Sequence, residues 1–291
     1  MGVAERGKIT AKEMEQGLGR LGFTASALLW ERPFLGPLYT WSAAVRGKMG
    51  SMRVPTMLKA ILRFIGERVG QGGDFHKPRP PRNDLKPDLK FFTDAKATET
   101  GAWIGGYLVG EDGKPGSWFS EEVRGDWADW IFIKKDKKRL IASLELLGSL
   151  VALKLWLPST RSDSRGVCQV YGGTDNQGNS YALSKCMTTK YPMTLLVMEV
   201  SETLREKRCE LHLEWIRRDK NQLADDLTNG QFQHFDPKQR TRWDGATCQW
   251  IVLQKFLAHA RGYHQQLVSE KSSKASRETE TRTKKTRLDK W

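Results

Sequence analysis

The sequence predicts an α/β fold, with a mixed five-stranded sheet flanked by helices and a small helical segment before it. Three observations lead to this class. The chain of 291 residues is 38% hydrophobic and contains eleven Trp, which is typical of a globular protein. Helical periodicity dominates before a Pro- and Gly-rich stretch, and strand-like segments begin only after it. The later strands are separated by helices, as in parallel crossover connections.

Residues 1–69 are expected to form the helical segment. Thr10 to Glu13 fits a capping box at the start of a helix. A second helical stretch follows Pro33, and a third, Met57 to Val69, places its apolar residues on one face. Gly and Pro are frequent in 70–87, and this composition predicts a linker.

The residues after the linker, 88–268, are expected to form the main domain. Its first three strands are predicted to form an antiparallel meander, at Leu89–Asp94, Gly101–Val109 and Trp118–Val123. Two further strands, Val167–Thr174 and Glu210–Arg217, are each reached through helices, so we expect both to be parallel additions to the sheet.

Helices are expected between and after the last strands, and the domain should end in a helix. The expected helices are Leu140–Leu155, Asn179–Thr188, Met193–Arg208, a short acid-bearing helix from near Asn221, and Ala246–Val268. The tail, 269–291, is basic and rich in Ser and Thr, and its composition predicts disorder.

The charge of the chain points to a polyanionic partner. The net charge is +14 and the pI about 9.7, and nucleic acid is the commonest partner of so basic a protein. A basic protein without a specific partner is the alternative. The four Cys lack zinc-ligand spacing and suggest a reducing compartment. With no secretory segment and no apolar run of membrane-spanning length, we expect an intracellular protein, cytoplasmic or nuclear, without a membrane partner.

Four acidic residues stand out, although each has an ordinary structural explanation. Asp94 and Asp175 follow apolar strands, where a turn or a helix cap would also explain an Asp. Asp225 fits the first turn of a helix, where acids are common. Glu145 is harder to explain, because its helix is apolar on nearly every face and an unpartnered carboxylate there is costly.

The predicted sheet would bring these acids together. If the first and fourth strands are parallel neighbours, Asp94 and Asp175 lie at the same edge, and the helix with Glu145 crosses beside it. Carboxylates that converge repel one another and raise each other's pKa, and a divalent ion would relieve this repulsion. A site made only of oxygen ligands favours Mg²⁺ or Mn²⁺.

The four acids and their neighbours resemble the pattern of type 1 ribonuclease H over about half of the chain. The matching residues are Thr93-Asp94, Glu145, Thr174-Asp175 and Ala224-Asp225. The resemblance implies a ribonuclease H-like domain that hydrolyses the RNA strand of RNA–DNA hybrids with two Mg²⁺ or Mn²⁺ ions. It also implies that Asp94 contacts both ions. Glu145 and Asp175 would then bind one of the ions, and Asp225 would bind the other.

The sequence departs from this family in one loop. Many members carry a His between the fifth strand and the last acid that assists proton transfer and product release. Here the loop, 217–222, has none, so the resemblance implies slow turnover. Residues expected to contact nucleic acid are Lys96, Asn176, Arg217, Arg218 and Lys220, and solvated surface charge is the alternative for the cations. The Trp residues, such as Trp118 and Trp215, are expected in the core.

In detail the chain resembles the ribonuclease H region of a retroelement reverse transcriptase, of the DIRS-like type. Leu18 to Tyr39 is similar to the helical piece that joins a reverse transcriptase thumb to its ribonuclease H. The missing polymerase portion is therefore a candidate partner. Three alternatives stay open: an inactive nucleic-acid-binding module of the same fold, an integrase- or transposase-like nuclease acting on DNA, and an α/β protein whose acids are only caps and turns.

Overall fold

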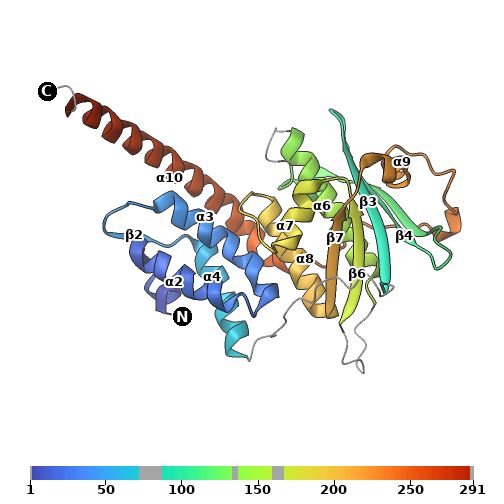
Figure 1. The fold of residues 1–291 in the computed structure, drawn as a ribbon, viewed down its shortest axis with the longest axis horizontal. Coiled ribbons are helices and arrows are strands. Elements are labelled where there is room, and N and C mark those ends of the chain that lie inside the picture. The colour runs from blue at the N-terminus through green and yellow to red at the C-terminus, as the bar shows by residue number, and fades with distance from the viewer. Residues whose placement is uncertain (1, 72–86, 133–136, 159–166, 289–291) are drawn as a thin grey trace. The chain divides into compact units, whose positions relative to one another are not determined.

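The structure is a computed structural model that describes residues 2–71, 87–132, 137–158 and 167–288 (Figure 1). It divides into two compact units. The helical unit is Met1–His76 with Gln254–Trp291, and the sheet unit is Lys77–Leu253. The sequence placed the last helix in the main domain, whereas most of it groups with the helical unit. The linker expected at 70–87 lies almost entirely outside the described residues, and the domain boundaries stay a prediction.

The helical unit consists of helices, a 3-10 helix and two short strands. They are α1 (Gly2–Arg6), β1 (Lys8–Thr10), α2 (Ala11–Thr24), a 3-10 helix (Leu29–Phe34), α3 (Leu35–Val45), β2 (Ser51–Arg53), α4 (Thr56–Gly70) and α10 (Val252–Leu288). The predicted capping box is present, because Glu13 N donates to Thr10 Oγ1 and Thr10 N donates to Glu13 Oε2. The antiparallel pair β1–β2 was not predicted, since three-residue strands carry no readable periodicity.

Aromatic packing joins α10 to the rest of the helical unit. The Phe256 ring lies 5.6 Å from that of Phe64 and 6.2 Å from that of Phe34, measured between centroids. The Tyr263 hydroxyl donates to the Pro37 carbonyl at 2.6 Å. The helix continues to Leu288, whereas the sequence predicted a disordered tail from residue 269. None of the helices described is long and apolar enough to cross a membrane.

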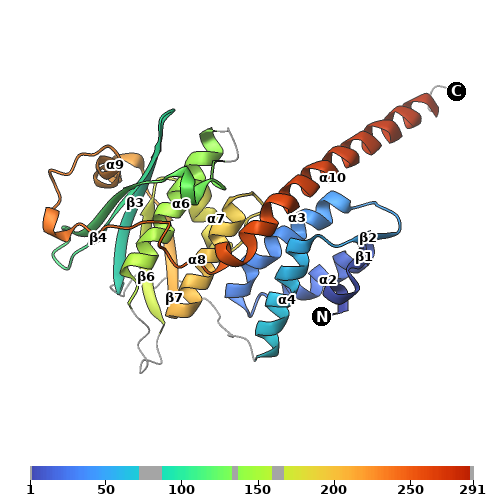
Figure 2. The ribbon, with the colours of Figure 1, turned by 180° about the vertical axis from the view of Figure 1, so that it is seen from behind.

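The sheet unit is built on the five-stranded mixed sheet that the sequence predicted (Figures 1 and 2). Its strands are β3 (Leu89–Ala97), β4 (Ala102–Val109), β5 (Pro115–Glu122), β6 (Cys168–Thr174) and β7 (Cys209–Trp215), in the order β5-β4-β3-β6-β7. The pairs β3–β4 and β4–β5 are antiparallel, and the pairs β3–β6 and β6–β7 are parallel. The expected meander with two parallel additions is therefore confirmed.

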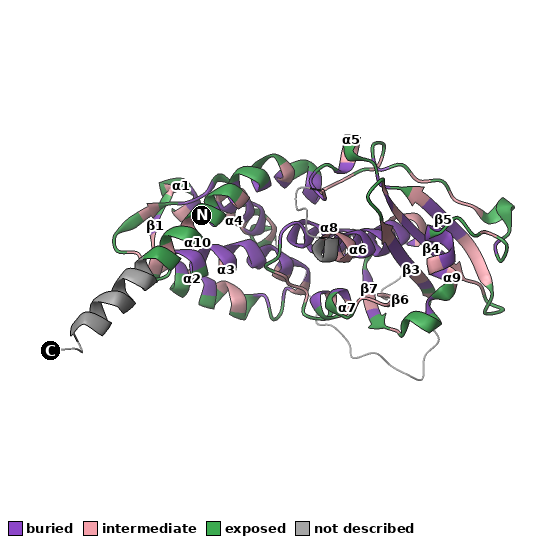
Figure 3. Ribbon diagram, turned by 90° about the horizontal axis from the view of Figure 1, so that it is seen from above, coloured by how far each residue is buried: buried purple, intermediate pink, exposed green. Residues whose placement is uncertain are grey.

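Helices cover both faces of the sheet. They are α5 (Gly125–Ala128), α6 (Lys137–Trp156), α7 (Gln177–Ser184), α8 (Met193–Lys207) and α9 (Gln222–Thr228), with 3-10 turns η2 (Arg218–Lys220) and η3 (Pro237–Gln239). Successive residues of β3 reach opposite faces, as strand geometry requires. The Thr93 hydroxyl lies 3.1 Å from that of Ser149 on α6, and Asp94 accepts a hydrogen bond from Thr228 on α9. Figure 3 shows how much of α6 and α8 is buried.

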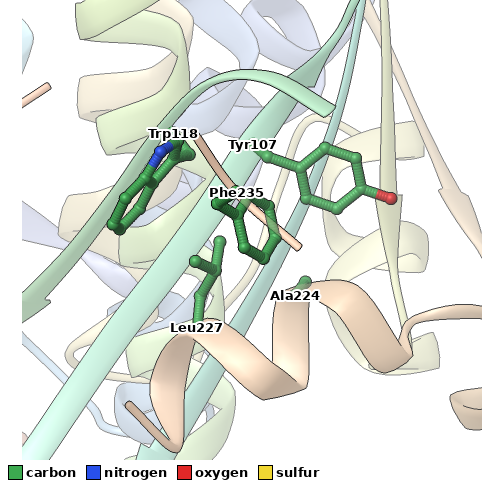
Figure 4. Packing of buried hydrophobic residues seen from close by; sticks show 5 residues of the cluster. All are labelled: Tyr107, Trp118, Ala224, Leu227 and Phe235. Carbon is green, nitrogen blue, oxygen red and sulfur yellow. The ribbon is translucent and has the colours of Figure 1, made fainter. Parts of the chain in front are cut away.

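A cluster of apolar side chains packs α9 against β4 and β5 (Figure 4). Its fully packed members are Tyr107, Trp118, Ala224, Leu227 and Phe235. The close approach of α9 depends on Gly105 of β4, because a Cβ at that position would lie 2.8 Å from the Leu227 Cβ. This packing fixes the helix that carries Asp225 beside the strand that carries Asp94.

Glu199, a second acid in an apolar helix, stabilises the fold. Glu199 of α8 is fully buried, and its carboxylate accepts backbone N–H bonds from Ile251, Val252 and Leu253 at 2.7–3.0 Å. Lys154 Nζ lies 3.0 Å from the same carboxylate. The acid therefore satisfies free N–H groups within the sheet unit, which ends at Leu253 after the first two residues of α10, and a negative charge is favoured at a helix start.

We predict that Gly105→Ala destabilises the sheet unit by about 1–3 kcal/mol, because the new methyl group would push α9 away from β4. Urea denaturation followed by circular dichroism measures this change. Gly125→Ala is the matched control, since nothing lies within 4 Å of a Cβ at Gly125. An equal stability of both variants would show that α9 does not pack as closely as described.

Candidate functional site

Asp94 and Asp175 lie at matching positions on the neighbouring parallel strands β3 and β6. Phe92 is paired with Gly173, so the residues two places further along each strand are Asp94 and Asp175. Asp94 was expected to end its strand, but β3 continues to Ala97 because these residues still pair with β4. Asp175 directly follows β6. Residues at matched positions of adjacent strands lie roughly 5 Å apart at their backbones.

Glu145 reaches the same strand ends from α6. It lies in the middle of this helix and is only 7% exposed. The Thr174 hydroxyl, at the end of β6, donates to Glu145 Oε2 at 3.1 Å. The Asn176 side chain acts on Glu145 by lowering its pKa, and it accepts from Asn179 N, which caps α7. Glu145 is thus the predicted buried acid, held by side chains on both sides of Asp175.

Asp225 approaches from α9 and is tied to Asp94 through one threonine. The Thr228 hydroxyl lies 3.0 Å from Asp94 Oδ2 and 2.9 Å from the Asp225 carbonyl oxygen. The Asp225 carboxylate accepts from Asn229 Nδ2 at 2.8 Å and from Arg218 Nη2 at 3.2 Å. The start of α9 is fixed by Asn221, whose side chain donates to the Thr93 carbonyl at 3.0 Å.

The acids act on one another electrostatically. Burial, followed by the charges of Asp175 and Asp225, raises the pKa of Asp94 to about 7. Burial also raises the pKa of Glu145, and the charges of Asp175 and Asp94 add to this effect. Hydrogen bonds from Thr228 and Thr174 act in the opposite direction. The charges of Asp175 and Asp225 thus act on Asp94, and those of Asp175 and Asp94 act on Glu145.

The donor set suits a hard divalent cation in its chemistry. All four side chains are carboxylates, and their mutual repulsion is the kind that a cation relieves. The Arg218 guanidinium already supplies one positive charge to Asp225. In the part of the chain that the structure describes, however, no three His, Cys, Asp or Glu residues are grouped so that they could hold an ion together. Metal binding would require the carboxylates to move closer, so the metal site stays a prediction.

The residues expected to contact nucleic acid differ in their partners. Lys96 Nζ donates to Asn229 Oδ1 at 2.8 Å, and Asn176 caps α7 beside Glu145. Arg217 pairs with Asp219 at 3.1 Å, Arg218 pairs with Asp225, and Lys220 is exposed. Arg218 therefore contacts Asp225 directly and Lys96 is linked to it through Asn229, while the role of all four cations as phosphate contacts is untested.

Sequence reasoning missed the polar side chains that hold the acids in place. Thr228 is the last residue of the short α9 and Asn229 follows it, and nothing in their spacing distinguishes them from ordinary surface residues. The prediction that Trp215 lies in the core was wrong. Its side chain is 47% exposed at the end of the edge strand, with the indole N–H donating to the Asp175 carbonyl at 3.1 Å. Trp118, in contrast, is buried as expected.

Comparisons with known proteins find likeness in structure but not in sequence. No protein-family model matches the sequence, and no curated protein does. Ribonuclease H1 from the archaeon Halobacterium salinarum is 16% identical, with 50% of this chain and 96% of its own covered, at a TM-score of 0.36. LC11 ribonuclease H1, solved with an RNA/DNA hybrid, is 18% identical to this chain. The match covers 49% of this chain and 95% of that chain, at a TM-score of 0.38. A foamy viral protease-reverse transcriptase, solved with double-stranded DNA, is 14% identical to this chain. The match covers 70% of this chain and 32% of that chain, at a TM-score of 0.23.

We predict that the metal-free protein loses stability as the pH rises from about 4 to about 7. The raised pKa of Asp94 means that the folded state favours the protonated carboxyl group. Its contribution to stability is complete below the pKa of the unfolded chain, and it is lost as the pH rises through the folded pKa of about 7. The free energy of unfolding, measured by urea titration in EDTA across this range, checks the direction.

Asp94→Asn should flatten this decline, because an amide carries no proton to lose. Asp112→Asn is the control with an exposed acid, in the turn between β4 and β5. A decline of equal steepness in the wild type and in Asp94→Asn would contradict the assignment of the pH dependence to this cluster.

Proposed function

We propose that the sheet unit is a metal-dependent ribonuclease H-type endonuclease that hydrolyses the RNA strand of RNA–DNA hybrids. One observation carries the proposal. The β3–β6 register sets Asp94 and Asp175 side by side, and Glu145 and Asp225 reach them from helices on opposite faces of the sheet. Buried acids with a raised pKa, as Asp94 and Glu145 have, are expensive to maintain and are typical of functional sites.

Asp94, Glu145, Asp175 and Asp225 would hold two Mg²⁺ or Mn²⁺ ions. When bound, such ions supply Lewis-acid activation of a water molecule and stabilise the charge on the leaving oxygen. The side chains around the acids would set their orientation. Thr228 holds one oxygen of Asp94, and Thr174 holds one oxygen of Glu145, so that the remaining lone pairs of each carboxylate stay available.

The substrate proposal combines the resemblance in sequence with the surface charge. Hybrid duplexes are recognised through groove shape, 2′-hydroxyls and phosphates rather than through their bases. The cations Lys96, Arg217, Arg218 and Lys220 would contact phosphates, while Asn176 would orient the strand beside Asp175. The products would carry 5′-phosphate and 3′-hydroxyl ends. A place in a DIRS-like reverse transcriptase, with the polymerase portion as partner, is part of the same proposal and rests on the sequence resemblance.

A nucleic-acid-binding module without nuclease activity is the second candidate. It is favoured by the absence, in the described part of the chain, of three acids grouped to hold an ion, and by the loop without His. The same surface cations would serve such a module, because phosphate contacts do not need the carboxylates.

We predict Mg²⁺-dependent cleavage of the RNA strand in a labelled RNA–DNA hybrid by the full chain. Asp94→Asn should lower the rate by more than about 100-fold, because Asp94 is the acid shared by the whole cluster. Denaturing gels of the labelled strand measure the rate. Duplex DNA of the same sequence is the control substrate, and its cleavage would point to an integrase-like nuclease instead. Hybrid binding without cleavage at any divalent ion concentration would favour the binding module.

A further inference from the structure

Arg218 contacts the carboxylate cluster directly, although its side chain is almost free in solvent. It opens the short turn η2, and its Nη2 lies 3.2 Å from Asp225 Oδ1. The side chain of Arg218 is 81% exposed, whereas that of Asp225 is only 22% exposed. The hydrogen bond and the charge of Asp225 raise the pKa of Arg218, and the charges of Asp175 and Asp94 add to this effect. Arg218 is therefore a largely exposed cation that is paired with one acid of the cluster.

The neighbouring cations are arranged differently. Arg217 pairs with Asp219, an acid that is 56% exposed and stands outside the cluster. Lys96 does not touch Asp225, because Asn229 lies between them and accepts from Lys96 while donating to Asp225. The direct contact of Arg218 is thus a specific feature of this side chain and not a general effect of the basic surface.

We propose that Arg218 is a built-in counter-ion of the acids, which neutralises Asp225 in the metal-free protein and moves to a nucleic-acid phosphate when a divalent ion binds. This inference rests on the proposed metal site. A guanidinium and a divalent ion compete for the negative charge of one carboxylate and repel each other when both are close. Because the Arg218 side chain is exposed, its ion pair with Asp225 contributes little free energy and can break at little cost. The released guanidinium can then bind a phosphate.

The competition between Arg218 and metal is tested by calorimetric titration of the full chain with Mn²⁺ at low ionic strength. Arg218→Gln should bind Mn²⁺ about fivefold more tightly than the wild type, because the competing charge is removed. Arg217→Gln, which removes the same charge one residue away, is the matched control and should bind as the wild type does. Equal affinities of the two variants would overturn the inference and leave the nuclease proposal intact. No Mn²⁺ uptake by the wild type would end both.

The movement to phosphate is tested by measuring hybrid binding with Ca²⁺ and with EDTA, on gels that verify an intact RNA strand. With Ca²⁺, Arg218→Gln should bind the hybrid about fivefold more weakly than the wild type, since the released guanidinium is missing. In EDTA the two should bind alike, because Arg218 stays on Asp225. Arg217→Gln should show the same ratio to wild type in both conditions. A loss in Arg218→Gln that is equal with Ca²⁺ and EDTA would overturn the proposed exchange.

Discussion

The pairing of β3 with β6 is the constraint on which the candidate site depends. It sets the register that places Asp94 beside Asp175, and it is possible because β6 has Gly172 and Gly173 opposite two aromatic residues. A Cβ at Gly173 would lie 2.3 Å from the Phe92 ring, and one at Gly172 would lie 2.7 Å from Phe91. Larger residues would force the strands apart or shift the pairing. The aromatic residues fill the sheet faces, and the glycines make room for them.

The same arrangement carries an electrostatic cost. Asp94 and Glu145 are buried, and the charge of Asp175 raises the pKa of each. Hydroxyl donors offset part of this cost, since Thr228 and Thr174 each satisfy one carboxylate oxygen. A fold selected for stability alone would not keep these acids together. A local loss of folding stability of this kind is typical of sites that are retained for function.

The sequence predicted the fold well because its signals are local. Strand alternation, helix periodicity and the Thr10 capping box each act over a few residues. The site was harder, as two glutamates show. Glu145 and Glu199 both lie in apolar helices and are both buried, yet Glu145 faces other acids while Glu199 binds backbone N–H groups and Lys154. The partners come from distant parts of the chain, so no local pattern separates the two roles.

The unequal anchoring of the acids has a consequence for heating. Asp94 stands on the central strand, which is paired on both sides and covered on both faces. Asp225 stands on α9, a helix of seven residues held mainly by side chains. Short elements of this kind open before central strands do, in local fluctuations that leave the rest of a protein folded. Any activity that needs Asp225 would therefore fade at a temperature where the sheet itself is still intact.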